Sequence, residues 1–268
     1  MKKHISILLI LCLLLAPLAA LAEGITVNRR DLSQNKELDS SVSNILVLLQ
    51  NGDVTDTLMI ASINSDTGRA VMTRVDCALE VEVRDAGTYP IGEVYALGDK
   101  NSKGPLAMRT VNEWLELNIA KYVALDVTVM PELVGNVGAL NMDLDAAEAE
   151  AMGLREGRNQ LTGEQAIEFV LLELEDDSPA RSRGYDALMQ LLYQVLNDGG
   201  IMSKGSAAVS LLGAMDTNLN IFEGFAFVGS VQGGDDRREL ALPGELAEDD
   251  EMPDAQAMRD AFYREVYE

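Results

Sequence analysis

The chain has 268 residues and a formal net charge of −23 at pH 7, from 44 acidic and 21 basic side chains. A surface this acidic repels nucleic acid and anionic lipid head groups, so nucleic acid is excluded as an expected partner. Apolar residues make up 47% of the sequence, which is enough to build the hydrophobic core of a globular domain.

The first 22 residues have the pattern of a cleavable signal peptide. Lys2 and Lys3 precede an apolar run over 5–15, and the tripeptide ALA at 20–22 precedes Glu23. A basic start, a short apolar run and small residues before the cleavage point are typical of export signals. The run is also short for a membrane-spanning helix. We therefore predict an exported protein on the extracellular side of the cell membrane or in the cell wall. A retained signal anchor is the alternative.

Cleavage would leave few residue types for chemistry. The only histidine, His4, and one of the two cysteines, Cys12, lie in the predicted signal peptide, so the mature chain keeps Cys77 alone. This excludes a Ser-His-Asp triad, a histidine zinc site and an intramolecular disulfide. Any reaction must therefore use carboxylates, arginines, hydroxyl groups or a bound metal ion.

The first half of the mature chain is predicted to be rich in β-structure. Residues 23–43 are polar and weakly patterned, as in a linker. Four runs of strand length then follow at 44–50, 57–63, 68–74 and 78–83. The turn sequence NSDTG at 64–68 joins the second and third runs and predicts a hairpin.

Helices alternate with strands in the remainder. The patterns predict helices at 105–117, 128–138, 161–174, 180–196, 206–215, 220–232 and 254–267, and strands at 121–127, 139–144 and 237–244. Such alternation predicts one α/β domain with a mixed central β-sheet covered by helices on both faces. We divide the chain into a signal peptide (1–22), a linker (23–43), the domain (44–245), and an acidic linker with a C-terminal helix (246–268).

The ordered set of segments resembles the LytR–CpsA–Psr family of bacterial cell-envelope proteins. The resemblance is carried by NILVLL at 44–49, DTLMIASINSDTGRAVMTRVD at 56–76, VYALG at 94–98, VNEWLELNIAKYVALDV at 111–127, LVGNVGALNMDL at 133–144, LTGEQAIEFV at 161–170 and the segment 216–245. It covers nearly all of the mature chain.

The resemblance implies a function and a site. Active members transfer a glycopolymer from an undecaprenyl-pyrophosphate carrier to a peptidoglycan hydroxyl outside the membrane. Arginines hold the pyrophosphate by bidentate hydrogen bonds, and aspartates bind a Mg²⁺ ion that neutralises charge as the bond to phosphorus breaks. Asp56 and Asp76 match the family's acidic positions and are the expected metal ligands, with Asp76 and Arg74 as catalytic candidates. Asp126 matches a further acid at a strand end.

The arginine pattern departs from that of the family. Val54 stands where the family has an arginine before Ser-Asp-Thr, and the family's Pro-Arg-Asp is Arg74-Val75-Asp76 here. A shift of one residue turns a strand side chain to the opposite face. Glu173 replaces a cation, and reversing one charge about 4 Å from a phosphate changes the interaction by several kcal/mol at an effective dielectric constant near 20.

Three cations remain as candidate phosphate ligands, Arg74, Arg181 and Arg183. Surface ion pairs are the alternative role for Arg181 and Arg183.

Three functional hypotheses follow. The leading one is a catalytically degenerate envelope protein that binds a polyprenyl pyrophosphate lipid or glycopolymer, or regulates an active relative. The second is an active Mg²⁺-dependent phosphotransferase that uses the remaining arginines. The third is a secreted interaction domain without a ligand, in which the acidic surface and the terminal helix are the active parts. As the alternative to a working site, Asp56 satisfies turn amides at a strand end, and Asp76 pairs with Arg74 or with a neighbouring helix terminus.

Overall fold

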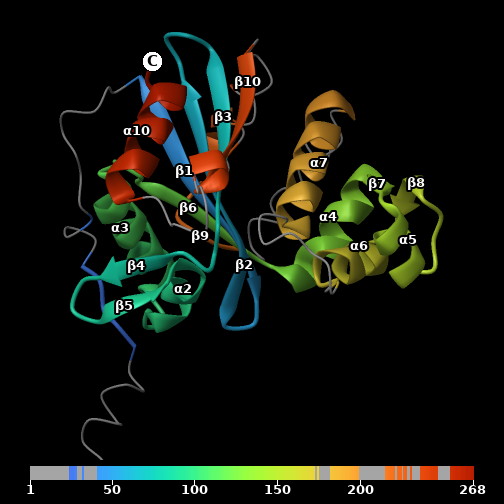
Figure 1. Cartoon of the computed structure of the whole chain (residues 1–268), viewed down its shortest axis with the longest axis horizontal. Helices are drawn as coiled ribbons and strands as arrows, with labels where there is room; N and C mark the ends of the chain where they lie inside the picture. Colours follow the sequence, from blue (N-terminus) through green and yellow to red (C-terminus); the bar gives the residue numbers. More distant parts are fainter. Residues whose placement is uncertain are drawn as a thin grey trace, which may run out of the picture.

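The protein is described here from a computed structural model, which defines residues 24–28, 32, 41–172, 174, 182–198, 215–220, 222–224, 226–227, 230, 236–246 and 254–268. The chain forms three layers, with a twisted sheet between two layers of helices (Figure 1). The predicted signal peptide and the predicted helix at 206–215 lie outside the described residues.

The central sheet has six strands within the described part of the chain, in the order β10-β3-β2-β1-β6-β9. Their bounds are β1 (Val42–Asn51), β2 (Val54–Asn64), β3 (Arg69–Val75), β6 (Lys121–Asp126), β9 (Asp216–Thr217) and β10 (Asp236–Leu242). β1, β2 and β3 form an antiparallel meander, while β6 lies parallel to β1 and β10 lies parallel to β3. The sheet is therefore mixed, as predicted.

The hairpin predicted at 64–68 is confirmed, and its turn chemistry is visible. The side-chain oxygen of Asn64 accepts hydrogen bonds from the backbone N–H groups of Asp66 at 3.1 Å and Thr67 at 3.2 Å. Gly68 then adopts a positive φ of 72°, which glycine takes without steric cost. This turn fixes the pairing of β2 with β3, and so brings the start of β2 beside the end of β3.

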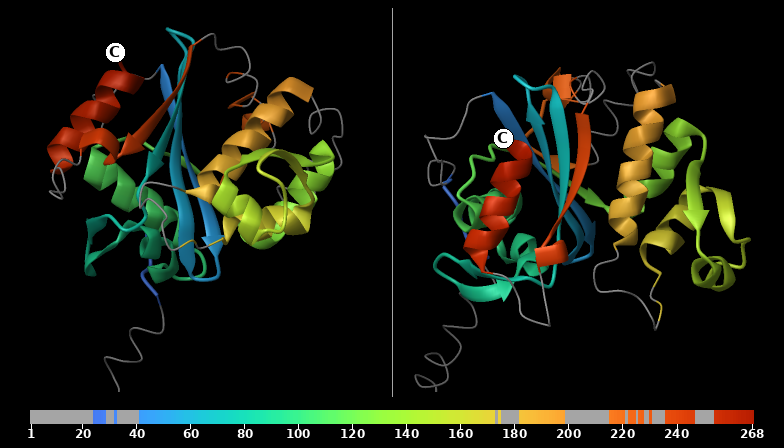
Figure 2. Two further views of the ribbon diagram at one scale, coloured as in Figure 1. Left: turned by 45° about the vertical axis from the view of Figure 1, so that its right-hand side comes forward. Right: turned by 45° about the horizontal axis from the view of Figure 1, so that its top comes forward.

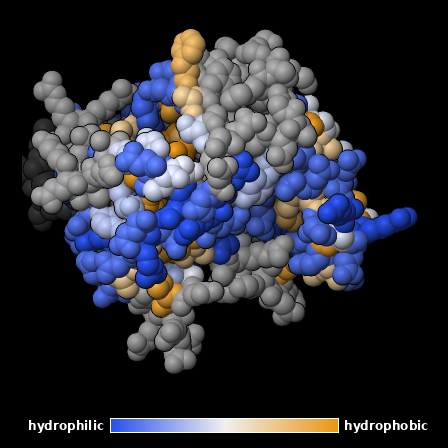
Figure 3. Space-filling view, turned by 90° about the horizontal axis from the view of Figure 1, so that it is seen from above, coloured by the Kyte–Doolittle hydropathy of each residue, from blue (hydrophilic) through white to orange (hydrophobic). Residues whose placement is uncertain are grey.

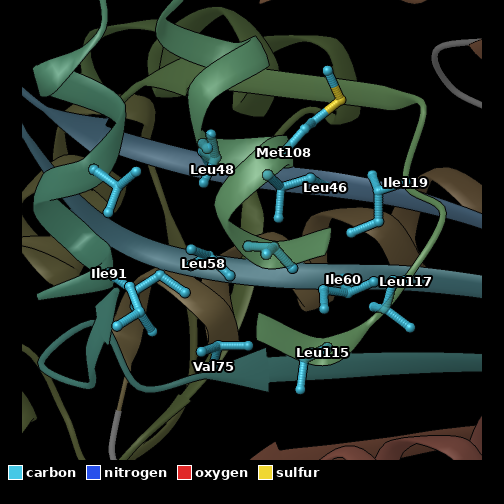
Figure 4. Packing of buried hydrophobic residues seen from close by; sticks show 14 of the residues in the cluster. Leu46, Leu48, Leu58, Ile60, Val75, Ile91, Met108, Leu115, Leu117 and Ile119 are labelled. Carbon is cyan, nitrogen blue, oxygen red and sulfur yellow. The ribbon is translucent and has the colours of Figure 1, made fainter. Parts of the chain in front are cut away.

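One face of the sheet packs on the first layer of helices. This layer holds α3 (Lys103–Leu115) and α10 (Ala255–Val266), together with η1 (Ile91–Glu93), α2 (Val94–Leu97) and the small hairpin of β4 (Glu80–Val83) and β5 (Gly87–Pro90). Because side chains alternate along a strand, Leu58 and Ile60 of β2 face this layer and meet Leu115 of α3 (Figure 4). Phe262 of α10 is fully buried in the same core.

The other face packs on a second layer of helices and a second hairpin. Here lie η2 (Val127–Val129), α4 (Met130–Val137), α5 (Ala146–Ala151), α6 (Gly163–Val170) and α7 (Arg183–Asp198), with the hairpin of β7 (Leu140–Leu144) and β8 (Gly157–Leu161) at its outer edge (Figure 2). Met59, Ala61 and Ile63 of β2 face this layer. The predicted covering of both faces by helices is confirmed.

Most predicted elements are found, with shifted ends. The helix predicted at 161–174 is present as α6, and Thr162 and Gln165 form a reciprocal capping box at its start. That helix nevertheless ends at Val170. Of the predicted helix at 220–232, residues 222–224, 226–227 and 230 are helical, and most of the remainder lies outside the described residues. The structure adds η1, α2, α5, β5, β8, β9 and the short turn η3 (Gly244–Leu246), which the patterns did not predict.

Within the residues described, no helix combines the length and apolar character that crossing a membrane requires. Seen from above, the coloured surface is dominated by hydrophilic residues with scattered hydrophobic ones (Figure 3). This agrees with the strongly acidic composition of the chain.

Candidate functional site

Asp56 lies near the start of β2, where the strand meets the second layer of helices. Its side chain is half-buried, and Thr57 donates a long hydrogen bond of 3.4 Å to its Oδ2. Burial raises the pKa of the Asp56 carboxyl, and the Thr57 hydrogen bond opposes that rise. The carboxylate therefore occupies a partly desolvated position near the start of β2.

The first turn of α7 packs directly against this carboxylate. Ser182 precedes the helix, and its Oγ accepts a hydrogen bond from the N–H of Tyr185 at 3.2 Å, as a helix cap does. The same Oγ lies 3.0 Å from Oγ1 of Thr57. A Cβ at Gly184 would lie 2.1 Å from Thr57 Oγ1 and 2.7 Å from Asp56 Oδ2, so only glycine permits this approach.

Asp76 lies just beyond the end of β3, at the same end of the sheet as Asp56. The ladder of β2 and β3 ends with Leu58 opposite Val75. The residues that precede Leu58 therefore lie beside those that follow Val75. Asp76 Oδ1 accepts a hydrogen bond from the N–H of Ala78 at 2.9 Å, as an aspartate does in a turn.

Cys77 follows Asp76 in the chain and contacts the backbone of Asp56. Its Sγ donates to the backbone oxygen of Asp56 at 3.6 Å. Burial, with smaller contributions from the charges of Asp56 and Asp76, raises the pKa of the Cys77 thiol to about 12. Both carboxylates thus add to the effect of burial on this one partly buried thiol.

Arg74 faces the second layer of helices. It pairs with Met59, whose side chain belongs to that layer's core, and its guanidinium carbon lies 5.7 Å from the ring centre of Tyr185 on α7. A guanidinium over an aromatic face is an attractive arrangement. Val75 points the other way and is buried in the opposite core. The shift by one residue therefore puts the arginine on the same face as α7.

Arg183 is engaged inside the protein. Its side chain is 5% exposed, and Nε donates to Glu148 Oε1 at 3.0 Å while Nη1 donates to the backbone oxygen of Leu172 at 2.9 Å. Glu148 is itself fully buried, and its Oε2 accepts from the N–H of Asp145 in the capping box of α5. The alternative role of Arg183 in a surface ion pair is corrected here, because the pair is buried.

The other positions singled out in the sequence differ in their surroundings. Val54 begins β2 with 54% of its surface exposed, which is unusual for an apolar side chain. Asp126 accepts hydrogen bonds from the N–H and hydroxyl of Thr128 and so caps η2. Arg181 and Glu173 lie outside the described residues.

Few described side chains at this site could bind a magnesium ion. In the described part of the chain, no three acidic, histidine or cysteine side chains come together. Mg²⁺ is commonly held by one or two carboxylates together with substrate phosphates. In such an arrangement Asp56 and Asp76 would be the two carboxylates, and a phosphate ligand would complete the coordination.

Several residues of this site gave no signal in the sequence. Ser182, Gly184, Tyr185 and Glu148 contact the predicted residues only because α7 and α5 pack there. The pair Ser182 and Asp186 does have the spacing of a helix start, since a serine cap is often followed by an acid in the first turn. That spacing would have moved the predicted helix start from 180 to the observed position.

Comparison with known proteins agrees with this architecture. A TagU polyisoprenyl-teichoic acid–peptidoglycan teichoic acid transferase of Oceanobacillus iheyensis is 24% identical over 184 residues, covering 66% of this chain and 57% of that protein. The TagV transferase of Bacillus subtilis is 21% identical over 182 residues, covering 64% of this chain and 46% of that protein. The chain thus spans about half the length of the curated relatives it matches.

Solved structures with the same fold cover more of the chain. The crystal structure of Bacillus subtilis TagT superposes with a TM-score of 0.69 at 15% identity, covering 91% of this chain and all of that one. A form of TagT with bound octaprenyl pyrophosphate lipid superposes with a TM-score of 0.65 at 16% identity and the same coverage. The model of the LytR_cpsA_psr family matches residues 30–259, and the chain therefore belongs to the LytR_cpsA_psr family.

Proposed function

We propose that this protein is an exported cell-envelope protein that binds a polyprenyl-pyrophosphate-linked glycopolymer without efficiently transferring it. Relatives named as teichoic acid transferases, and a structural neighbour with a bound polyprenyl pyrophosphate, support the ligand class. The protein would then act by holding the lipid-linked polymer or by regulating an active relative.

The engagement of Arg183 inside the protein carries the proposal. A pyrophosphate is a concentrated anion, and proteins bind it through several guanidinium groups with free N–H donors. Here Arg183 gives two of its nitrogens to Glu148 and to a backbone carbonyl, and Arg74 lies over an aromatic ring. At Val54, where the resemblance implies a further arginine, an exposed apolar side chain stands. Among the described residues, the site therefore offers Asp56 and Asp76 with Arg74 as the cation that is not committed to an internal ion pair.

Thermal unfolding with and without a soluble prenyl pyrophosphate tests ligand binding. A ligand at a hundred times its Kd stabilises the folded state by about 2.7 kcal/mol, which a higher Tm would report. We expect a Tm shift in the presence of Mg²⁺ and no measurable release of prenyl pyrophosphate from a lipid-linked donor. The absence of any shift at millimolar ligand would overturn the proposal and favour the interaction-domain hypothesis.

Restoring a cation gives a sharper test. Val54→Arg adds a guanidinium at an exposed position at the edge of the site, so we expect prenyl pyrophosphate to bind at least about tenfold more tightly, equivalent to 1.4 kcal/mol. Gln256→Arg on α10 adds the same charge on the opposite side of the sheet and should leave the Kd unchanged. An equal gain in both variants would mean that net charge, and not the site, governs binding.

An active phosphotransferase is the second candidate, because Arg74 does lie on the face where α7 meets Asp56. In that case Asp56 and Asp76 would hold Mg²⁺, which supplies charge neutralisation at the phosphates when bound. This candidate predicts metal-dependent consumption of the lipid-linked donor by the unaltered protein. Asp76→Asn would abolish that turnover. In a protein that only binds the ligand, the same substitution would weaken binding and nothing more.

A further inference from the structure

A cavity of about 540 Å³ lies in the first layer, on the opposite side of the sheet from α7. Its walls come from β4 and the residues beside it, the end of α3, and the first turns of α10, three elements that lie near one another in Figure 1. Trp114 of α3 and Met258 of α10 are its large apolar residues. We call this the β4 cavity.

The cavity follows an edge of β4. Four consecutive residues, 79–82, line it. Side chains alternate between the two faces of a strand, so a cavity on one face would contact every second residue. Contact with consecutive residues therefore means that the cavity runs along the backbone at an edge of the strand. β5 pairs with the other edge of β4, and within the described residues no strand covers the edge at the cavity.

The hydrogen bonds of the β4–β5 hairpin show which backbone groups face the cavity. Just before β4, the backbone oxygen of Leu79 accepts from the N–H of Ile91 at 2.8 Å. Bonded pairs alternate along an antiparallel ladder, so Val81 also turns its backbone groups toward β5. The N–H and C=O groups of Glu80 and Glu82 therefore point the other way, into the cavity.

These outward backbone groups have no partner in the part of the chain that the structure describes. Neither Glu80 nor Glu82 makes a backbone hydrogen bond outside the hairpin. Pro90 of β5 lies opposite Glu80 and has no N–H to donate, in agreement with that assignment. A strand edge with unpaired N–H and C=O groups is a template for a further strand. An extended peptide can pair here as the third strand of the hairpin.

Two carboxylates without partners flank this edge. Glu80 and Glu82 are exposed on the outer face of β4, and neither has an ion-pair partner among the described residues. The two arginines of the cavity wall, Arg84 and Arg259, are each paired with a glutamate at the end of α3. The charge left at the edge is therefore negative, like the net charge of −23 on the whole chain. Both attract a cationic partner.

These charges also decide between a second copy of the chain and a different partner. Two copies of β4 in antiparallel pairing would bring Glu80 and Glu82 of one against those of the other, and like charges directly opposite are destabilising. A segment with lysine or arginine at alternate positions would instead place cations opposite these glutamates. Its intervening residue would turn to the inner side, where Val81 is buried and where Trp114 and Met258 form an apolar wall.

We propose that the free edge of β4 binds an extended segment of a partner protein in which basic and apolar residues alternate. The backbone of the segment pairs with that of Glu80 and Glu82, its cations lie on their carboxylates, and an apolar side chain packs against Trp114. This surface lies on the opposite side of the sheet from the candidate site, so one protein can hold both occupants. The inference goes beyond the proposed function and does not rest on it.

Fluorescence of Trp114 tests the inference, because this residue is the only tryptophan of the chain and lies half-buried in the cavity wall. The whole protein is titrated with the end-blocked peptide Thr-Lys-Val-Lys-Ile-Thr. We expect a saturable change in emission with a Kd below about 1 mM. A peptide with both lysines N-methylated on the backbone keeps the charge but loses two N–H donors, and its Kd should be at least about tenfold higher.

Reversal of the edge charges supplies the matched variants. Glu80→Lys combined with Glu82→Lys should raise the Kd of the lysine peptide at least about tenfold. Glu150→Lys combined with Glu156→Lys makes the same change in net charge at exposed positions of the second layer, and should alter the Kd less than about twofold. The peptide Thr-Glu-Val-Glu-Ile-Thr should bind the first double variant more tightly than it binds the native protein.

Four results would overturn the inference. The first is the absence of both an emission change and a heat of binding at about 5 mM peptide. An equal Kd for the N-methylated peptide would leave charge alone as the cause, and an equal loss in both double variants would leave net charge. Self-association of the free protein that the peptide reverses would assign the edge to a second copy. The Tm shift with prenyl pyrophosphate should be equal in the two double variants, so each proposal can fail without the other.

Discussion

The hydroxyl of Thr57 on β2 lies 3.0 Å from that of Ser182, the residue that caps α7. This contact brings the helix onto the strand that carries Asp56, and it depends on the absence of a side chain at Gly184. Gly184→Ala places a methyl group 2.1 Å from Thr57 Oγ1, so the first turn of α7 must move. We expect a loss of about 1–3 kcal/mol in the free energy of unfolding, measured by urea denaturation, and weaker binding of prenyl pyrophosphate.

Gly135→Ala is the matched control for that substitution. Gly135 lies within α4, and a Cβ there would meet nothing within 4 Å. Alanine favours helix over glycine by up to about 1 kcal/mol, so this variant should be as stable as the native protein or more stable. Equal stability of Gly184→Ala and the native protein would mean that α7 does not pack against β2 as described.

The ion pair of Arg183 with Glu148 should be a major source of stability for the second layer. Removing one partner of a buried pair leaves the other charged and unpaired, at a cost of about 3–5 kcal/mol. Glu148→Ala should therefore lower the free energy of unfolding by that amount, as measured by chemical denaturation.

Glu150→Ala, on the exposed side of the same helix, should change stability by less than about 0.5 kcal/mol. If Glu148→Ala were as mild as this control, Arg183 would be available for other partners, and the argument for a cation-poor site would fail.

Asp56 should make stability depend on pH. Burial raises the pKa of its carboxyl above the ordinary value of 3.8, so the folded state holds this proton more tightly than the unfolded state. Ionising the group therefore costs stability, and this cost appears as pH rises through 3.8 and is complete above the folded pKa. Asp56→Asn should raise the Tm at pH 7, with a gain that shrinks toward zero as the pH falls to 3.8.

Asp53→Asn removes the same charge from the exposed turn before β2. Comparison of the two variants separates the cost of burying the Asp56 charge from the general charge repulsion in an acidic protein. A lower Tm in Asp56→Asn than in Asp53→Asn at pH 7 would show that the carboxylate is a net stabilising group. Ligand binding should decrease in Asp56→Asn alone.

Cys77 should be nearly inert toward alkylating reagents in the folded protein. The thiolate is the reacting form, and burial together with Asp56 and Asp76 raises the pKa of this thiol to about 12. At pH 8 we expect iodoacetamide to modify Cys77 only after unfolding in denaturant, with peptide mass spectrometry identifying the site. Rapid labelling without denaturant would show that the Cys77 thiol is open to solvent.

The patterns of apolar residues were sufficient for the strands of the meander. Most residues in 57–63 and 68–74 are apolar or β-branched, and the turn NSDTG favours a tight hairpin, so local chemistry fixes the register. β8 could not be predicted in this way. Its sequence Gly-Arg-Asn-Gln-Leu has little strand preference, and it extends because β7 supplies hydrogen-bonding partners.

The sequence by itself determined the mixed sheet, the helices on both faces, the acids at the ends of β2 and β3, and the departure from the family's arginines. Each of these follows from local periodicity or from residue identity at a matched position. The tertiary structure alone decided that Arg74 lies over Tyr185, that Arg183 is buried with Glu148, and that α7 contacts Asp56 through Gly184. These contacts join residues far apart in the chain, and their geometry depends on how the helices pack against the sheet, which no local pattern records.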